Sequence, residues 1–147
     1  MRRINFFLVY FVAAFIVSTS FMVTFASGTE GPKRYFTVYS IDYHNQSSLR
    51  LTWNNGLQAR TIIMHVDNVN LPSGYMGVFP RLYNDNGVVV SEPLAWVYNN
   101  SPAVGLEAPA PTYTQKGAYY SHGLTRAYNG NGYTQHSTYR SPSLNIN

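Results

Sequence analysis

The sequence predicts an all-β protein, a mainly antiparallel β-sandwich of about seven to eight strands. Two observations lead to this prediction. Apolar and polar residues alternate over short segments, and no long window shows the three-and-four spacing of an amphipathic helix. Gly, Pro, Asn or Ser interrupts the chain about every ten residues, which is typical of sandwiches and barrels. A chain of 147 residues favours a single domain of this kind.

Eight strands are predicted in order along the chain, because each is rich in β-branched, aromatic or alternating apolar residues. They cover residues 34–43, 49–53, 57–67, 75–83, 88–92, 94–98 and a final hairpin of 112–129 with 132–140. Turns are expected at 44–48, at Asn54-Asn55-Gly56 and at Asn86-Gly87, and a long connection at 101–111. In the 57–67 strand, Ile62, Met64 and Val66 share one face, and His65 is expected on the opposite, exposed face.

A two-residue turn at Asn86-Gly87 predicts the register of the middle hairpin. It places Asp85 opposite Val88, and Arg81 opposite Glu92 on the solvent face. The residues expected to point inward are Met76, Val78 and Leu82. Pro80 cannot donate to a β-ladder, so its strand is expected to be at an edge or to bulge there.

The last hairpin is rich in tyrosine, and its loop length decides which side chains share a face. A two- or four-residue loop within 129–132 pairs Tyr128 with Tyr133 or Gln135. In either register one face carries Tyr120, His122, Leu124, Tyr128, Tyr133 and Tyr139, and we expect this more apolar face to meet the core. The other face carries Ser121, Thr125, Thr134, His136 and Thr138 and is expected to meet water. His122 and His136 then could not share a metal ion, whereas a three-residue loop would bring them together.

The first 26 residues are predicted to be a secretory signal peptide. A basic start at Arg2 and Arg3 precedes an apolar run over 6–17. Thr24 and Ala26 then supply the small residues of a cleavage site, so cleavage is expected after Ala26. The predicted organisation is a signal peptide at 1–26, a mobile lead at 27–33 and a single β-sandwich domain at 34–147.

An uncleaved membrane anchor over residues 6–25 is the alternative, since this stretch is about long enough to span a hydrocarbon core. Ser18, Thr19 and Ser20 interrupt the apolar run, which favours cleavage. A secreted location is therefore expected.

Charge and cysteine content narrow the function classes. Eight basic and six acidic residues remain after residue 26, a net charge of +2 scattered along the chain. This differs from the clustered basic patch of a nucleic-acid-binding protein, so no nucleic-acid partner is expected. The chain has no cysteine, and secretion without cysteine is a habit of Gram-positive bacteria.

The search for reactive groups predicts no enzyme. There is no cysteine nucleophile, no Gly-x-Ser-x-Gly motif and no histidine pair at a metal-ligand spacing. The six carboxylates include no evident pair for glycoside hydrolysis. No catalytic residue, cofactor or metal site is therefore predicted.

Tyrosine is the unusual feature of the composition, with 13 residues, of which twelve follow residue 26. Tyrosine suits strands and cores, and it also suits binding surfaces because it joins a rigid apolar face to a polar tip. Both interpretations stay open. The residues of a possible ligand platform are Tyr120, Tyr128, Tyr133 and Tyr139.

Three segments carry a resemblance to known proteins: Ala118–Gly123 (AYYSHG), Ala127–Tyr133 (AYNGNGY) and Tyr139–Ser143 (YRSPS). Together they resemble the tail of small uncharacterised β-proteins secreted by Gram-positive bacteria, and Arg81-Leu82-Tyr83 is similar too. The Tyr-Ser-His hairpin is also similar to bacteriocins of the lactococcin-972 type. The resemblance implies no known activity and no functional residue.

These observations predict a secreted, non-enzymatic binding or interaction module that acts at the cell surface. Its expected partner is an extracellular protein or a cell-wall glycan, and it would meet a membrane only through an uncleaved signal segment. A bacteriocin-like antagonistic protein is the alternative function, and a cell-wall glycan hydrolase is the third.

Overall fold

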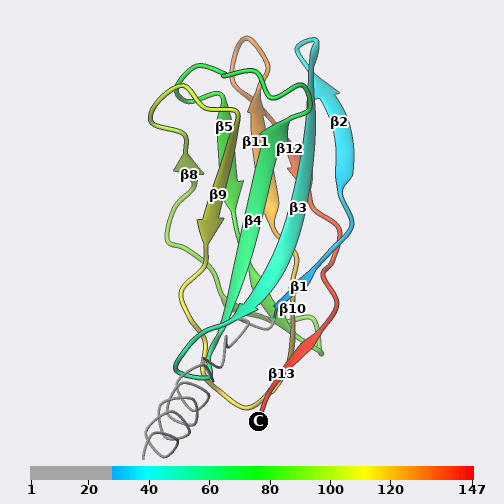
Figure 1. Cartoon of the computed structure of the whole chain (residues 1–147), viewed down its shortest axis with the longest axis vertical. Coiled ribbons are helices and arrows are strands. Elements are labelled where there is room, and N and C mark those ends of the chain that lie inside the picture. Colours follow the sequence, from blue (N-terminus) through cyan, green and yellow to red (C-terminus); the bar gives the residue numbers. More distant parts are fainter. Residues whose placement is uncertain (1–27) are drawn as a thin grey trace, which may run out of the picture.

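The computed structural model describes residues 28–147, which form thirteen β-strands and no helix (Figure 1). The all-β prediction is confirmed, although the strands are shorter and more numerous than the seven or eight expected. Within the described residues, no helix is long and apolar enough to cross a membrane. The predicted signal peptide (1–26) and the alternative anchor (6–25) lie outside them.

One layer of the sandwich is a five-stranded antiparallel sheet, here called the first sheet. Its strand order is β1-β3-β4-β9, and β2 also pairs with β3. The bounds are β1 Gly28–Glu30, β2 Arg34–Val38, β3 Ile41–Leu51, β4 Leu57–His65 and β9 Gly105–Pro109. The eleven-residue β3 and the nine-residue β4 form the longest pair in the molecule.

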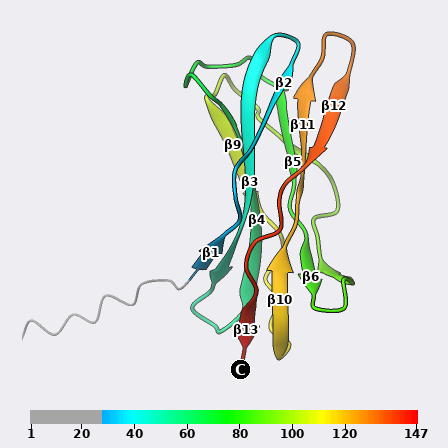
Figure 2. The same cartoon turned by 90° about the vertical axis from the view of Figure 1, so that its right-hand side faces the viewer.

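The opposite layer consists of two four-stranded sheets placed end to end (Figure 2). The upper sheet has the order β12-β11-β5-β8 and contains β5 Met76–Phe79, β8 Val97–Tyr98, β11 Leu124–Tyr128 and β12 Tyr133–Ser137. The lower sheet has the order β13-β10-β6-β7 and contains β6 Leu82–Asn84, β7 Val89–Ser91, β10 Gly117–Ser121 and β13 Leu144–Ile146. The chain breaks between them at Pro80 and at Gly123, so each long predicted strand becomes two short ones.

Three predictions about the chain path were wrong. The first reversal occurs at Tyr39 and Ser40, whose φ angles are 53° and 59°, and the predicted turn at 44–48 lies inside β3. The predicted mobile lead contains β1, which pairs with β3. The predicted connection at 101–111 contains the edge strand β9, and the prolines of this segment are the reason that a loop was predicted there.

The middle hairpin also differs from the prediction. The backbone N–H of Asn84 donates to Val88 O, and that of Gly87 donates to Asn84 O, both at 3.0 Å. The loop therefore has three residues, with Gly87 at φ +77°, in place of the two expected. Asp85 does not face Val88. A bulge between Leu82 and Tyr83 then restores the pairing of Leu82 with Ser91.

The inward direction of Met76, Val78 and Leu82 is confirmed, since all three are fully buried. Arg81 and Glu92 lie just beyond the paired residues of β6 and β7. They form no ion pair: the pairs within residues 28–147 are Arg60–Glu107 and Arg140–Asp85.

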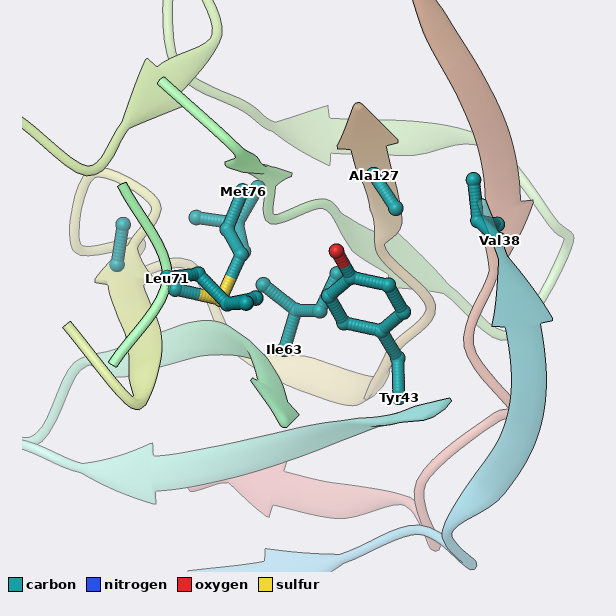
Figure 3. Packing of buried hydrophobic residues seen from close by; sticks show 8 residues of the cluster. Val38, Tyr43, Ile63, Leu71, Met76 and Ala127 are labelled. Atoms are coloured by element: carbon teal, nitrogen blue, oxygen red, sulfur yellow. The ribbon is translucent and has the colours of Figure 1, made fainter. Parts of the chain in front are cut away.

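Two hydrophobic cores fill the space between the layers. The upper core, shown in Figure 3, consists of Val38, Tyr43, Ile63, Leu71, Met76, Val78, Ala108 and Ala127. The lower core consists of Leu49, Leu57, Ala59, Leu82, Ala110, Tyr119 and Ile146. His65 is on the inward face of β4 and is buried, with its Nδ1 accepting from Asp67 N at 3.0 Å. The prediction that His65 is exposed was wrong, because Ile62 and Met64 occupy the outward face.

A polar waist separates the two cores. On β3, Asn45 and Ser47 lie between Tyr43 of the upper core and Leu49 of the lower core. Asn45 Nδ2 donates to Thr125 Oγ1 at 2.7 Å, and Ser47 Oγ donates to Tyr139 O at 2.6 Å. These bonds cross from one layer to the other, so buried hydroxyl and amide groups join the layers here.

The two faces of the tyrosine-rich hairpin are therefore the reverse of the prediction. Tyr128 pairs with Tyr133 across a four-residue loop, as the even-loop register predicted. However, Ser121, Thr125 and Thr138 are buried against the first sheet, and the tyrosine face is turned outward. Small hydroxyl residues fit the narrow waist and find hydrogen-bond partners there, which large rings could not do.

Candidate ligand-binding face

The outward side of the upper and lower sheets collects eight of the sixteen Phe, Trp and Tyr side chains within residues 28–147. Along β10 and β11 the odd-numbered residues from 119 to 127 are buried, so the even-numbered ones point outward. The outward residues are Tyr120, His122, Leu124, Arg126 and Tyr128, and all of them are half-buried.

The upper aromatic cluster lies on the upper sheet and the segments that enter it. Its members are Tyr75, Phe79, Trp96, Tyr98, Tyr128 and Tyr133. Ring centroids are 6.2 Å apart between Tyr128 and Tyr133, 5.1 Å between Tyr98 and Tyr133, and 5.4 Å between Phe79 and Trp96. Most pairs are tilted or edge-to-face, so the rings form a contiguous but uneven surface.

Close backbone approach positions these rings. Gly77 of β5 is opposite Tyr98, and a Cβ on Gly77 would lie 2.7 Å from Cε1 of the Tyr98 ring. The ring therefore needs a glycine beneath it. The Tyr133 hydroxyl donates to Gly74 O and the Tyr128 hydroxyl to Gly130 O, each at 2.8 Å. Partial burial raises the pKa of Tyr133, which stays a neutral donor at physiological pH.

Arg126 occupies the middle of the upper aromatic cluster. Its Cζ lies 4.0 Å from the centroid of the Trp96 ring, and its Nη1 donates to the Tyr98 hydroxyl at 2.9 Å. Cation–π contact and this hydrogen bond hold the guanidinium over the aromatic surface.

The lower aromatic cluster is a stack of four planar groups on the lower sheet. Tyr83 and Tyr120 are paired across β6 and β10, and their rings are nearly parallel, with centroids 5.2 Å apart. Arg81 Cζ lies 5.3 Å from the Tyr83 centroid, and Arg140 Cζ lies 3.5 Å from the Tyr120 centroid. His122 lies beside Tyr83, and burial followed by the charge of Arg81 lowers the pKa of His122.

The two clusters together are called here the aromatic–arginine face. Of its three arginines, only Arg140 forms an ion pair within residues 28–147, with Asp85 at 3.8 Å between exposed side chains. Such a pair is worth little in water. Arg81 and Arg126 have no carboxylate within 4.0 Å among the described residues, so the face carries positive charge.

The four candidate platform residues are not all brought together. Tyr128 and Tyr133 meet in the upper cluster, Tyr120 belongs to the lower cluster, and Tyr139 lies apart, half-exposed, with Arg34 Cζ 6.0 Å from its ring. Sequence reasoning missed five further rings of the face: Tyr75, Phe79, Tyr83, Trp96 and Tyr98. The alternation of Trp96 with Tyr98 was the available signal, but only the sheet order shows that β8 lies two strands away from β11.

The histidines are separated as the even-loop register predicted. His136 points into the molecule and stacks on Phe36 of β2, with ring centroids 3.9 Å apart, whereas His122 lies on the outward face. Within the described part of the chain, no three His, Asp or Glu side chains are grouped so as to hold a metal ion.

The chain matches no protein-family model, no curated protein sequence and no solved structure.

Proposed function

We propose that this protein is a secreted, non-enzymatic binding module that holds a cell-surface glycan on its aromatic–arginine face. The observation that carries the proposal is the gathering of at least eight aromatic rings on one outward sheet surface. Half-exposed rings offer flat apolar area that lies ready for the apolar faces of sugar rings, and their hydroxyl groups add hydrogen bonds.

A binding role is also supported by how the carboxylates are used. Glu107 is paired with Arg60, Asp42 accepts from Thr37 Oγ1, and Asp85 contacts Arg140. Glu30 accepts from Gln46 Nε2 at 3.4 Å, so four of the six carboxylates already contact side chains of their own protein, which suits structural roles better than the paired acids of a glycoside hydrolase.

Co-sedimentation with purified Gram-positive cell wall tests the proposed function. The double substitution Tyr128→Ala/Tyr133→Ala removes the centre of the upper cluster, and we expect it to lower the bound fraction at least tenfold. Tyr35→Ala is the matched control, because Tyr35 is 64% exposed and lies on the first sheet. Thermal unfolding of each variant shows that it is folded.

Other outcomes of the same assay would overturn the proposed function. Equal binding by the double variant and the wild type would show that the face is not the site. Reducing sugar released from the wall would favour the hydrolase, and killing of neighbouring bacteria without wall binding would favour the bacteriocin-like alternative.

Export is part of the proposed function and has its own test. N-terminal sequencing of protein recovered from the culture medium is expected to begin at Ser27, because Thr24 and Ala26 provide the small residues that signal peptidase requires. A protein that stays with the membrane and begins near Met1 would show that residues 6–25 are an anchor.

A further inference from the structure

We infer that the glycan bound by the aromatic–arginine face is acidic, carrying carboxylate or phosphate groups along a polymer that contacts both clusters. This inference rests on the proposed function and names its ligand class.

The arginines of the face are held ready for an anion. Arg126 lies over the Trp96 ring and uses one nitrogen to donate to Tyr98, and the structure shows no carboxylate within 4.0 Å of it among residues 28–147. A guanidinium has five N–H donors, so Arg126 keeps several for a ligand. Because the Trp96 ring already fixes the group, less side-chain entropy is lost on binding.

The lower cluster favours an anion over a sugar ring. Tyr83 and Tyr120 lie nearly parallel, and Arg81 and Arg140 each place a guanidinium over one of these two rings. The rings are therefore already in contact with one another and with cations, and the cluster offers a ligand the guanidinium of Arg81 and that of Arg140, which is only weakly paired with exposed Asp85. Planar guanidinium groups match carboxylate and phosphate geometry.

The upper cluster favours a sugar ring beside the anion. Tyr133 is 41% exposed, and its ring neighbours Tyr98, which receives the hydrogen bond from Arg126. An apolar ring surface and a fixed cation thus adjoin within one cluster. A sugar unit that bears its own acidic group would satisfy both.

The spacing of the clusters indicates a polymer. Tyr128 and Tyr120 are eight residues apart along β11 and β10, which is roughly 26 Å at about 3.3 Å per residue. His122, Leu124 and Arg126 line the outward path between them. One or two sugar units are too short to extend from Tyr128 to Tyr120, whereas an extended chain can.

Affinity electrophoresis of the secreted protein in gels containing soluble polymers tests the inference. The probes are polygalacturonate, its fully methyl-esterified neutral form, poly(glycerol phosphate) and single-stranded oligodeoxythymidine. We expect at least tenfold tighter binding to polygalacturonate or poly(glycerol phosphate) than to the neutral ester. The two acidic probes distinguish a uronate polymer from a phosphate polymer.

Charge variants identify the site. Arg81→Gln/Arg126→Gln is expected to weaken binding to the acidic polymer at least tenfold. Arg50→Gln/Lys116→Gln changes the net charge equally but at exposed positions outside the face, and it is expected to bind within twofold of wild type. Equal losses in both double variants would show a general charge effect and overturn the inference, as would equal binding to the ester or to oligodeoxythymidine.

Failure of the inference and failure of the proposed function give different results. Binding to the neutral ester that depends on Tyr128 and Tyr133, but not on Arg81 and Arg126, would leave a glycan-binding face and remove its acidic specificity. No binding to any polymer or to cell wall would overturn the proposed function itself.

Discussion

At the scale of single residues, the polar waist depends on one glycine. Gly123 lies where the upper and lower sheets meet, directly across from Thr61 of the first sheet. Its N–H is bonded to Thr138 Oγ1 at 2.9 Å, and Thr138 N donates back to Gly123 O at 3.0 Å. The absence of a side chain at position 123 lets its backbone approach Thr61 closely, beside the bonds from Asn45 to Thr125 and from Ser47 to Ser121 that join the two layers.

Gly123→Ala is therefore expected to destabilise the protein by about 1–3 kcal/mol. An added Cβ would overlap Thr61 Oγ1 and lie 2.9 Å from Thr61 Cβ, and Thr61 is fully buried and cannot move aside. Urea denaturation measures the change in free energy of unfolding. Gly132→Ala is the control, because a Cβ there meets nothing within 4 Å. Equal stability of the two variants would show that the waist is not tightly packed.

At the scale of elements, the β2–β3 hairpin uses a turn whose sequence does not suit it. Tyr39 and Ser40 both have positive φ, as a two-residue turn matched to the twist of a hairpin requires. Non-glycine residues pay a steric cost in this conformation. Contacts of the Tyr39 side chain offset this cost. The centroid of its ring lies 6.4 Å from that of Tyr128, and the ring lies over Gly130. Ser40 is exposed, and its side chain forms no hydrogen bond within residues 28–147.

Ser40→Gly is expected to raise the free energy of unfolding by about 0.5–1 kcal/mol, because glycine adopts φ of 59° without the steric penalty. Chemical denaturation measures this change in the free energy of unfolding. Ser48→Gly places the same substitution in the middle of β3, where glycine costs backbone entropy without relieving strain, so a loss of stability is expected there. A loss at both positions would contradict the account of the turn.

At the scale of the whole molecule, three histidines couple folding to pH. Burial, followed in each case by a neighbouring positive charge, lowers the pKa of His44, His122 and His136 below the ordinary value of 6.5. The neighbouring charges are Lys33, Arg81 and Arg34 respectively. The folded protein thus binds protons at these sites less tightly than the unfolded chain does.

The sign of the pH dependence follows. These histidines contribute fully to the free energy of unfolding above about pH 6.5, where they are neutral in both the folded and the unfolded chain. That contribution is lost as the pH falls from 6.5 through the lower pKa values of the folded state. We expect the melting temperature to fall between pH 7.5 and pH 5. His136→Gln should reduce the slope, because the stacked ring on Phe36 would no longer charge. A melting temperature that rises on acidification would contradict this assignment.

Part of the candidate face was predictable from the sequence, and part was not. Alternation and an even loop length were enough to limit the partner of Tyr128 to Tyr133 or Gln135 and to place His122 and His136 on opposite faces; the structure has Tyr133. Trp96 and Tyr98 complete the upper cluster. They come from the segment of β8, which is separated from β11 by β5 in the sheet. No local pattern encodes the order of strands in a sheet, so these neighbours were not predictable.

By itself the sequence determined the all-β class, the turn at Asn54-Asn55-Gly56 and which side chains of the last hairpin share a face, because these follow from local patterning and turn chemistry. Only the tertiary structure decided which face of that hairpin is buried. Tyrosine is stable half-exposed, and small hydroxyl residues are stable inside when they are hydrogen-bonded, so hydrophobicity hardly distinguishes the two faces. The side chains of the opposite layer distinguish the two faces, because Asn45, Ser47 and Thr61 form a narrow polar surface there. Ser121, Gly123 and Thr125 are small enough to pack against this surface, so the tyrosines lie outside.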